Sequence, residues 1–339
     1  MFGARCRRLG LAIVMGVGMA VAVGQPFHLP TRNQALFETG GAARYFAPTA
    51  VGDWTSGLYG CVRSNGGQFH EGIDILHEHT NRQGEPTDPV FATADGRVAY
   101  VSSNPSLSNY GIYIIVEHQV DGIEIHSIYA HLSAVEPGLR VGARVRAGQA
   151  LGTMGRTANT RSTISKERAH LHFELAIRLS DRFTAWQKER YKGQRNDHGE
   201  FNGRNFLGLD PIDVFREQAA RQSHFNLATM MRGQAELCRV LVRKTNLAIL
   251  QRLGPLVERN PRAEREGTAG YELALNYAGV PCRIVPRAPS EIAGRKDGDV
   301  LSVNEKELRE HRCRDLVTRS GKGWQLARSG TQLLDLLTY

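Results

Sequence analysis

The sequence predicts a mainly β domain, an antiparallel sheet or sandwich with a groove, followed by a small α+β domain at the C-terminus. Two runs of β-forming residues centred on Asp-Gly pairs, and closely spaced glycines after them, predict the short strands of the first domain between residues 60 and 179. A helical apolar period after Phe225, and shorter β-like runs after Pro261, predict the second.

The first 24 residues have the pattern of a secretory signal peptide. Three arginines precede a run without charge from Leu9 to Val23, which is too short to span a bilayer, and the small residues Ala20-Val21-Ala22 offer a cleavage site. No other segment is apolar enough to cross a membrane. We therefore expect export to the periplasm or the extracellular space, with no stable membrane insertion after cleavage.

Residues 25–58 are polar, contain three prolines and show no clear period, so we expect an extended N-terminal segment. The predicted β domain covers residues 59–214. Within it, residues 89–101 form one expected hairpin around Asp95-Gly96, and residues 110–131 form a second around Asp121-Gly122. Residues 180–209 are predicted to be a polar loop insertion, which the turn Leu209-Asp210-Pro211 closes.

Residues 215–339 are predicted to be a separate α+β domain, to which the sequence assigns no function. A helix is expected over Phe225–Leu253, and strands over Tyr271–Tyr277, Cys282–Val285 and Gly323–Ala327. Residues 25–230 carry 21 basic and 21 acidic side chains, whereas residues 231–339 carry 19 and 13, so the excess of six positive charges lies in this domain. Such a basic surface fits an anionic wall polymer or lipid headgroups, or has no partner at all; export disfavours nucleic acid.

Four cysteines remain after removal of the signal peptide: Cys61, Cys238, Cys282 and Cys313. An oxidising compartment favours disulfides, but four cysteines allow three pairings and the sequence does not choose among them. If all four pair, one bridge must lie within the region 238–313, because only one of its three cysteines can reach Cys61. Buried free thiols are the alternative.

The run His170-Leu171-His172-Phe173-Glu174-Leu175 alternates polar and apolar side chains. On a strand, His170, His172 and Glu174 share one face, while the apolar residues share the other and suit a core. Imidazole and carboxylate groups on one face are suitable ligands for zinc. The alternative is a half-exposed strand with incidental histidines.

His70 and Asp74 lie four residues apart, with Gly72 between them and β-branched Ile73 and Ile75 beside Asp74. The glycine and the isoleucines favour an extended segment over a helix, and on it His70 and Asp74 share a face. His131, at the end of a predicted strand, is a further candidate. Four other histidines in turn-prone surroundings are predicted to be surface residues: His77, His79, His118 and His126.

Four motifs in this order resemble the lysostaphin/LytM-type (β-lytic) zinc metalloendopeptidases, a family of peptidoglycan hydrolases. They are Phe-His-Glu-Gly-Ile-Asp from Phe69, Tyr-Ala-His-Leu from Tyr129, the glycine-spaced run from Gly148 to Gly155, and His-Leu-His-Phe-Glu from His170. The resemblance covers roughly residues 55–180. It implies one zinc ion per chain, held by His70, Asp74 and His172, with His131 and His170 as catalytic residues beside the metal.

The function that this resemblance implies is hydrolysis of peptide bonds in the stems or cross-links of peptidoglycan. Glu174 would orient a ligand from behind the site. The alternative is a wall-binding or amidase-activating module of the same fold without activity, which the complete ligand set argues against. Some relatives lay an N-terminal segment across the groove, and His28 or Asn33 would then take the fourth zinc position; a plain linker is the favoured alternative.

Overall fold

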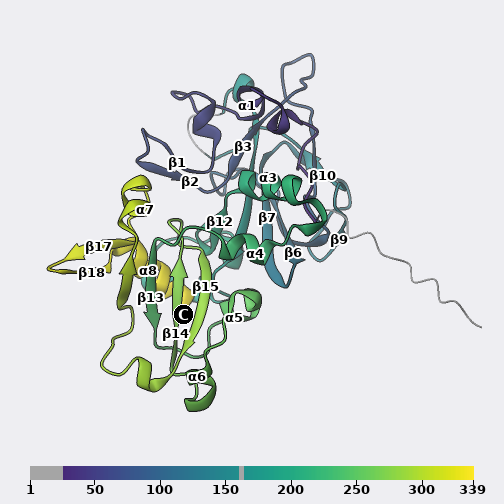
Figure 1. Ribbon diagram of the computed structural model, residues 1–339. Helices are drawn as coiled ribbons and strands as arrows, with labels where there is room; N and C mark the ends of the chain where they lie inside the picture. Colours follow the sequence, from purple (N-terminus) through teal and green to yellow (C-terminus); the bar gives the residue numbers. More distant parts are fainter. Residues whose placement is uncertain (1–25, 160–163) are drawn as a thin grey trace, which may run out of the picture.

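The structure is a computed structural model that describes residues 26–159 and 164–339. The predicted signal peptide therefore lies outside the described residues. Figure 1 shows two parts: strands in blue to teal form the upper part, and a green and yellow sheet with its helices forms the lower part. None of the helices in the described ranges has the length and apolar character that a membrane span requires.

A seven-stranded antiparallel sheet forms the centre of the first part. Its strands run in the order β12-β11-β7-β6-β5-β9, and β3 pairs with β11 next to β12. The bounds are β3 Ile73–Leu76, β5 Gly96–Ser102, β6 Ile112–Val120, β7 Ile123–Leu132, β9 Arg144–Val145, β11 His170–Arg178 and β12 Phe206–Leu209. The prediction of a mainly β, antiparallel first domain is confirmed.

Two smaller sheets accompany the main one. The first has the order β4-β10-β8, and the second is the hairpin β1-β2. Their bounds are β1 Gly60–Arg63, β2 Gln68–His70, β4 Pro89–Phe91, β8 Ala134–Val135 and β10 Ala150–Thr153. Since β2 ends at His70 and β3 begins three residues later, the hairpin lies at the edge of the main sheet.

Strand β11 is the core strand of this part. Leu171, Phe173 and Leu175 are fully buried, and the ring of Phe173 stacks on Phe215 of helix α3, Pro211–Arg221, with centroids 6.0 Å apart. The opposite face of β11, which carries His170, His172 and Glu174, is also at most 5% exposed. The strand is therefore buried on both faces, and its polar face needs hydrogen-bond partners.

One of the two predicted hairpins is confirmed and the other is wrong. Strands β6 and β7 pair across Asp121 and Gly122, whose φ angles of 52° and 77° are those of a tight hairpin turn. Strand β4 pairs with β10, whereas β5 pairs with β6 and β9, so residues 89–101 form no hairpin. Gly96 has no positive φ there; a Cβ on it would lie 2.4 Å from the carbonyl oxygen of Glu117, so this glycine permits close approach of β6.

The N-terminal segment is more structured than the predicted extended lead-in. It contains the 3-10 helix η1, Ala35–Phe37, the short helix α1, Ala42–Tyr45, and the 3-10 helix η2, Trp54–Gly57. Phe46 bridges to Ile75 of β3, and the backbone N–H of Ala47 donates to the carbonyl of Asp74 at 2.9 Å. The apolar residues Tyr45 and Phe46, which no period revealed, bury this segment against the sheet.

Residues 180–209 are not a loop insertion. They contain helix α2, Phe183–Arg190, and strand β12, which completes the main sheet by pairing with β11. The predicted closing turn is the start of a helix: the side chain of Asp210 accepts a hydrogen bond from the N–H of Ile212 and caps α3, with Pro211 in its first turn.

The second part is an α+β unit, as predicted, around a four-stranded antiparallel sheet in the order β15-β14-β13-β16. Its strands are β13 Cys238–Val242, β14 Gly270–Leu275, β15 Pro281–Arg287, β16 Val300–Val303, and the hairpin β17 Val317–Ser320 with β18 Gly323–Leu326. Its helices are α4 Leu227–Arg232, α5 Ile249–Arg252, α6 Pro261–Glu266, α7 Glu305–Glu310 and α8 Arg328–Leu337. The single helix expected over residues 225–253 is wrong, because β13 lies between α4 and α5.

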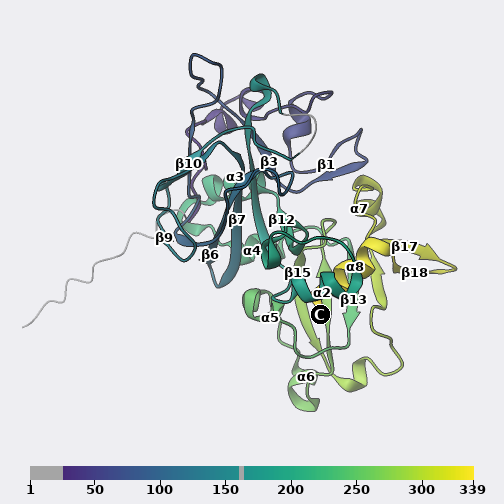
Figure 2. The ribbon, with the colours of Figure 1, turned by 180° about the vertical axis from the view of Figure 1, so that it is seen from behind.

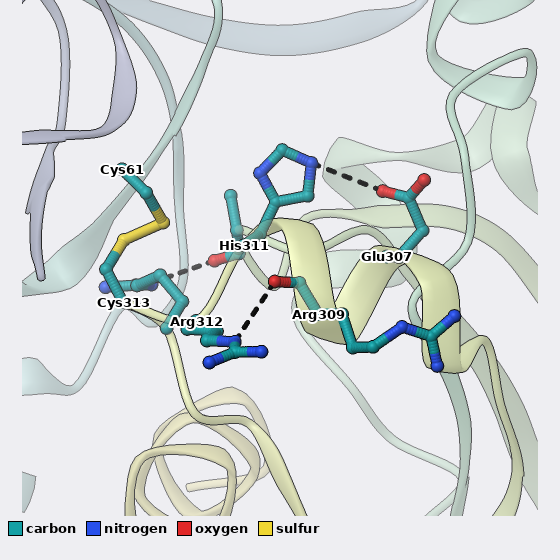
Figure 3. Close-up of a disulfide and its surroundings, with 8 residues drawn as sticks. Cys61, Glu307, Arg309, His311, Arg312 and Cys313 are labelled. Atoms are coloured by element: carbon teal, nitrogen blue, oxygen red, sulfur yellow. Dashed lines mark hydrogen bonds and ion pairs between the residues drawn. A yellow bond between two sulfur atoms is a disulfide. The ribbon is translucent and has the colours of Figure 1, made fainter. Parts of the chain in front are cut away.

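A disulfide and several polar contacts join the two parts. Cys61 of β1 is bonded to Cys313, 252 residues later, directly after α7 (Figure 3). Cys238 and Cys282 are buried free thiols, and burial raises the pKa of each to about 12. Helix α2 lies beside α8 (Figure 2). The indole N–H of Trp186 in α2 donates to Asp335 of α8 at 2.7 Å.

Candidate metal centre

His70, Asp74 and His172 come together at the junction of β2, β3 and β11. His172 lies directly opposite Asp74 in the pairing of β11 with β3, and His70 is the last residue of β2. His172 Nδ1 is 3.0 Å from Asp74 Oδ1, His70 Nε2 is 3.1 Å from His172 Nδ1, and His70 Nε2 is 3.2 Å from Asp74 Oδ1. These three potential metal-ligand atoms thus form a nearly equilateral triangle, the donor triangle.

Gly72 explains how the two halves of this triangle approach each other. A Cβ on Gly72 would lie 2.2 Å from the carbonyl oxygen of Phe173, closer than any side-chain atom can come. The absence of a side chain therefore lets the segment between β2 and β3 pass directly over β11. The extended conformation expected for residues 70–75 is confirmed in β2 and β3.

Hydrogen bonds behind the triangle determine which ring nitrogen of each histidine faces it. His70 Nδ1 donates to the carbonyl oxygen of Leu58 at 2.7 Å, so Nε2 turns toward Asp74. His172 Nε2 lies 2.9 Å from Glu174 Oε1, so Nδ1 turns toward Asp74. Tyr110 donates its hydroxyl to the same Glu174 oxygen at 2.5 Å. Supporting partners of this kind orient metal-binding imidazoles, and Glu174 is in the position that this role requires.

Asp74 divides its two oxygens between different partners. Oδ1 faces the imidazoles, whereas Oδ2 accepts a hydrogen bond from Arg63 Nη2 at 2.5 Å. The same Arg63 nitrogen lies 2.9 Å from His70 Nε2. Burial disfavours the ionised carboxylate, but the neighbouring His70 and His170 hold the pKa of Asp74 well below its usual range. Asp74 is therefore a buried anion, to which Arg63 and His172 donate.

His131 lies in a β-bulge that changes the direction of its side chain. Leu132 pairs with Ile112 and Tyr129 pairs with Ile114, so two residues of β7 face one residue of β6. His131 has φ 63°, in the left-handed region, and its Nδ1 donates to the carbonyl oxygen of Thr157 at 2.8 Å. The bulge places its ring 4.9 Å from that of His170 and 5.9 Å from that of His172, measured between centroids.

His131 and His170 are both held as neutral rings with a free Nε2. His170 Nδ1 donates to the carbonyl oxygen of Arg168 at 2.6 Å, and its Nε2 lies 3.6 Å from Asp74 Oδ1. Burial, together with the nearby His170 and His172, lowers the pKa of His131 to about 3. Burial also lowers the pKa of His170. Near pH 7 both rings are therefore neutral, and the lone pair of each lies on Nε2.

His172 differs from this pair. Burial favours its neutral form, but hydrogen bonds to the carboxylates of Asp74 and Glu174 prevail and raise the pKa of His172 to about 10. A cation bound at Nδ1 would replace the proton on that atom, since imidazole must be deprotonated at the nitrogen that binds a metal. Metal binding at this site is therefore expected to release a proton.

The donor set fits zinc. Zinc is bound at ~2.0–2.2 Å by histidine nitrogen and aspartate oxygen in a tetrahedral arrangement, which separates the ligand atoms by roughly 3.3–3.5 Å. The observed separations of 3.0–3.2 Å need only a small expansion to reach this range. Two imidazoles and one carboxylate also match the ligand types of zinc sites that keep a fourth position for another molecule.

The other histidines predicted to lie on the surface fall into two groups. His77 and His79 are at least partly exposed, and His79 Nδ1 contacts Asp88 at 3.1 Å. For His118 and His126 the prediction is wrong: both are buried in the pairing of β6 with β7, where the alternating apolar residues of the strands place them inside. All four are absent from the residues that line the cavity of the candidate site.

His28 and Asn33 do not contact the donor triangle. The backbone N–H of His28 donates to the carbonyl oxygen of Thr93, and the side-chain amide of Asn33 donates to that of Arg44. The residue that does contact the triangle from outside the predicted set is Arg63. No motif indicates the contact of Arg63 with Asp74. The sequence likewise does not identify Tyr110 as the partner of Glu174.

The donor triangle opens into a cavity of about 740 Å³ between the two parts of the chain. Its lining includes Asp74, His131, His170 and His172 from the first part and Arg314 with residues of α8 from the second. The predicted groove is therefore present, and the C-terminal part forms one of its walls.

Comparison with known proteins shows that this chain is similar to peptidases, and the matches also identify its family. The sequence profile of peptidase family M23 matches residues 68–183. Lipoprotein NlpD of Yersinia enterocolitica is 36% identical over 92 residues, which make up 27% of this chain and 80% of that protein. The chain belongs to peptidase family M23, as the resemblance of its motifs to lysostaphin/LytM-type enzymes predicts.

Solved structures of peptidases are also similar to this chain. A zinc-containing peptidase from Vibrio cholerae is 29% identical, with a TM-score of 0.23, over 32% of this chain and 26% of that one. The catalytic domain of the antimicrobial peptidase lysostaphin from Staphylococcus simulans is 21% identical, with a TM-score of 0.29, over 47% of this chain and 87% of that domain. The chain thus spans about a quarter of the Vibrio peptidase that it matches.

Proposed function

We propose that this protein is an exported zinc metalloendopeptidase that hydrolyses peptide bonds in the stems or cross-links of peptidoglycan. The observation that carries the proposal is the convergence of His70 Nε2, His172 Nδ1 and Asp74 Oδ1 within 3.2 Å of one another, next to two neutral histidines. Membership of a peptidase family supports the reaction class, and the NlpD relative, a lipoprotein by name, supports a place in the cell envelope.

His70, Asp74 and His172 would hold one zinc ion per chain. Bound zinc would supply a Lewis acid that polarises the peptide carbonyl and lowers the pKa of a bound water toward ~7. Leu58 and Glu174, through their hydrogen bonds to the two imidazoles, keep the correct ring nitrogens turned toward this position.

His131 and His170 would move the proton. Nδ1 of each neutral ring carries the proton and donates it in a hydrogen bond to a carbonyl oxygen. The free Nε2 is therefore an acceptor and not a donor. The first act of either ring is therefore to accept a proton from the attacking water. The resulting imidazolium can then stabilise the negative charge on the carbonyl oxygen, or deliver the proton to the leaving amine.

The test replaces His172, which contributes a donor atom, and compares it with an exposed histidine. We expect His172→Ala to lose bound zinc, measured by elemental analysis, and to lose hydrolysis of purified peptidoglycan by at least about a thousandfold. His224→Ala, which changes an exposed residue, should retain both. Mass spectrometry of the products identifies the bond that is cut.

Two results would count against the proposal. Cleavage of peptidoglycan by His172→Ala at the wild-type rate would show that the reaction takes place elsewhere. A wild-type protein that neither retains zinc nor hydrolyses peptidoglycan after zinc is added would instead be a wall-binding or amidase-activating module of the same fold.

A further inference from the structure

We propose that the C-terminal part of the chain gives the groove a carboxylate-binding wall, in which Arg314 binds a free carboxylate of an anionic peptide and Arg168 and Arg204 extend the same cationic surface. This inference rests on the proposed function, because it concerns the peptide that the same groove would bind. It adds a substrate class and a specificity-determining residue that lies outside the segment matching family M23.

Arg314 is held close to the donor triangle by covalent and aromatic contacts. It follows Cys313, which is bonded to Cys61 of β1, and Cys61 pairs with Phe69 across the hairpin β1-β2. The guanidinium carbon of Arg314 lies 4.7 Å from the centroid of the Phe69 ring. Phe69 immediately precedes His70, so the guanidinium is packed on the neighbour of a proposed zinc ligand. Figure 3 shows the disulfide and the end of α7 that lead into this arginine.

Arg314 forms no ion pair with a carboxylate among the described residues, and Glu71 of the same cavity acts on its charge only at longer range. Its Nη2 donates to the carbonyl oxygen of Ala278 at 2.8 Å, and its Nε is buried without any hydrogen-bond partner. Burial lowers the pKa of Arg314 relative to an exposed arginine, which reports the cost of keeping this charge away from water. A carboxylate that enters the groove would offset that cost through charge-assisted hydrogen bonds.

Paired arginines elsewhere in the same part of the chain provide a contrast. Arg239 and Arg287 both form ion pairs with Glu272 of β14. Arg314 differs from these two arginines because it lines the cavity and forms no ion pair with an acidic side chain among the described residues.

Two more arginines line the cavity without an ion-pair partner among the described residues. Arg168 Nε donates to the carbonyl oxygen of Pro48 at 3.0 Å, and the guanidinium of Arg204 lies 4.4 Å from the ring centroid of Tyr191. The carboxylates of the lining are Glu71 and Asp74, and Asp74 is already paired with Arg63. Positive charge therefore exceeds negative charge along the groove, before any zinc ion is counted.

The peptide that fits this surface carries free carboxylates at some distance from the bond that is cut. One carboxylate would meet Arg314 on the side of β1-β2, and others would meet Arg168 or Arg204. A neutral peptide, or one whose carboxylates are amidated, would leave these guanidinium groups without partners, so the groove should discriminate against it.

The test separates binding from catalysis. Muropeptides with free carboxylates, and the same muropeptides after chemical amidation, are titrated calorimetrically into the full-length His172→Ala variant, which does not turn them over. We expect the free acids to bind about tenfold or more tightly than the amides. Adding Arg314→Gln should reduce this preference severalfold by weakening only the acids, because Arg168 and Arg204 remain, and Arg314→Lys should restore part of it.

Arg312→Gln is the matched control, because Arg312 is exposed on the same segment, donates to the carbonyl oxygen of Arg309 and does not line the cavity (Figure 3). It should bind like the parent. In the zinc-loaded enzyme, Arg314→Gln should raise KM for the acids and leave kcat unchanged. A thiol titration of the denatured variants that finds the same number of free thiols as in the wild type shows that the Cys61–Cys313 bridge has formed in each variant.

Equal affinity for acids and amides in the parent would overturn the proposal, as would an Arg314→Gln variant that weakens both forms alike. The result is independent of the proposed reaction. If the wild-type protein hydrolyses nothing while the acids still bind through Arg314, the enzyme assignment fails and the carboxylate-binding wall stands.

Discussion

Arg63 and a metal ion would compete for the same nitrogen atom of His70. Since His70 Nδ1 donates to Leu58, the lone pair of the ring is on Nε2, and Arg63 Nη2 lies 2.9 Å from it. Two unit charges 4 Å apart repel by about 4 kcal/mol at an effective dielectric constant of ~20, and the repulsion is larger for a divalent ion. The guanidinium must therefore move away from His70 when a cation binds, and its hydrogen bond to His70 Nε2 is lost.

We predict that Arg63→Gln binds zinc more tightly than the wild type, by about tenfold. The wild type must break the hydrogen bond from the charged Arg63 to His70, worth about 1.5–3 kcal/mol, before zinc can bind, and the variant does not. Zinc affinity is measured by competition with a chromophoric chelator. Arg32→Gln, which changes an arginine of another cavity, should leave the affinity unchanged.

A lower zinc affinity in Arg63→Gln would show that Arg63 acts mainly by orienting Asp74 through Oδ2. The argument above requires the opposite sign, so the direction of the change decides between the two roles. Far-UV circular dichroism at matched concentrations verifies that the variant is folded.

His118 is buried, although its sequence surroundings predicted a surface residue. Its side chain is 1% exposed, Nδ1 donates to the carbonyl oxygen of Asp95 at 2.8 Å, and Nε2 accepts a hydrogen bond from Ser127 Oγ at 2.7 Å. Burial is the main cause that lowers the pKa of His118 to about 4, against ~6.5 for a free histidine. The titratable groups that face it are Asp95, Glu117 and His126. The two carboxylates raise the pKa of His118 but offset the lowering by burial only in part.

This pKa predicts an acid-sensitive fold. Above pH ~6.5 His118 is neutral in both states and contributes nothing to pH dependence. As the pH falls toward 4, the unfolded chain takes up a proton that the folded chain refuses, so the free energy of unfolding falls by up to about 3 kcal/mol. Below pH 4 both states are protonated and this contribution is constant.

Urea unfolding at pH 7, 6 and 5 tests this expectation. His118→Gln should be less stable than the wild type at pH 7 but should lose less stability between pH 7 and pH 5. The exposed His224→Gln should retain the full wild-type pH dependence. Parallel curves for the wild type and His118→Gln would mean that the acid sensitivity comes from other groups.

At the scale of elements, the parts of the fold that could be predicted are those where local and tertiary preferences agree. The hairpin β6-β7 has alternating apolar residues and a turn, Asp121-Gly122, with the positive φ angles that its residues favour. The strand β11 follows from the alternation at residues 170–175. His70, Asp74 and His172 meet because β11 pairs with β3, and the sequence indicated this grouping through the resemblance to lysostaphin/LytM-type enzymes.

The mispredicted elements are those whose pattern of apolar residues is compatible with both a helix and a strand. Leu237, Val240 and Leu241 fit one face of a helix, but they also fit a strand buried on both faces, and β13 is such a strand. The neighbouring strands β14 and β16 decide the outcome, and they lie 28 and 58 residues further along the chain at their nearest ends. No local window contains that information.

Arg63 shows why part of the site could not be predicted, and His131, which the resemblance implies, shows why its position could not be derived from local pattern. Arg63 reaches Asp74 because Ser64 and Asn65, in the turn between β1 and β2, both adopt positive φ, of 52° and 54°. His131 points toward the other histidines because of an extra residue in β7. Neither conformation follows from the residue types involved, since both depend on how the strands pair.

At the scale of the whole molecule, the Cys61–Cys313 bridge connects the strand beside the donor triangle to the wall that carries Arg314. Other contacts also join the two parts: Arg252 of α5 is paired with Glu124 of β7 at 3.0 Å, and the indole N–H of Trp186 donates to Asp335. Removal of the bridge should therefore loosen the region around Arg314 without separating the two parts.

We predict that Cys61→Ser combined with Cys313→Ser leaves zinc affinity unchanged but weakens binding of muropeptides with free carboxylates severalfold. The zinc ligands are held by the pairing of β3 with β11 and by the hydrogen bonds of Leu58 and Glu174, whereas Arg314 depends on its covalently attached neighbour. In the chain-entropy model, a bridge that closes a loop of this length contributes up to about 5 kcal/mol, so the free energy of unfolding should also fall.

Cys282→Ala, which removes a buried thiol that forms no bridge, provides the control and should retain the preference for free acids. Stability alone does not explain the expected pattern, because a general loss of structure would reduce zinc affinity as well. If the double serine variant binds acids as tightly as the wild type, Arg314 is positioned by its stacking on Phe69 and by Ala278 alone, and the disulfide serves only the stability of the molecule.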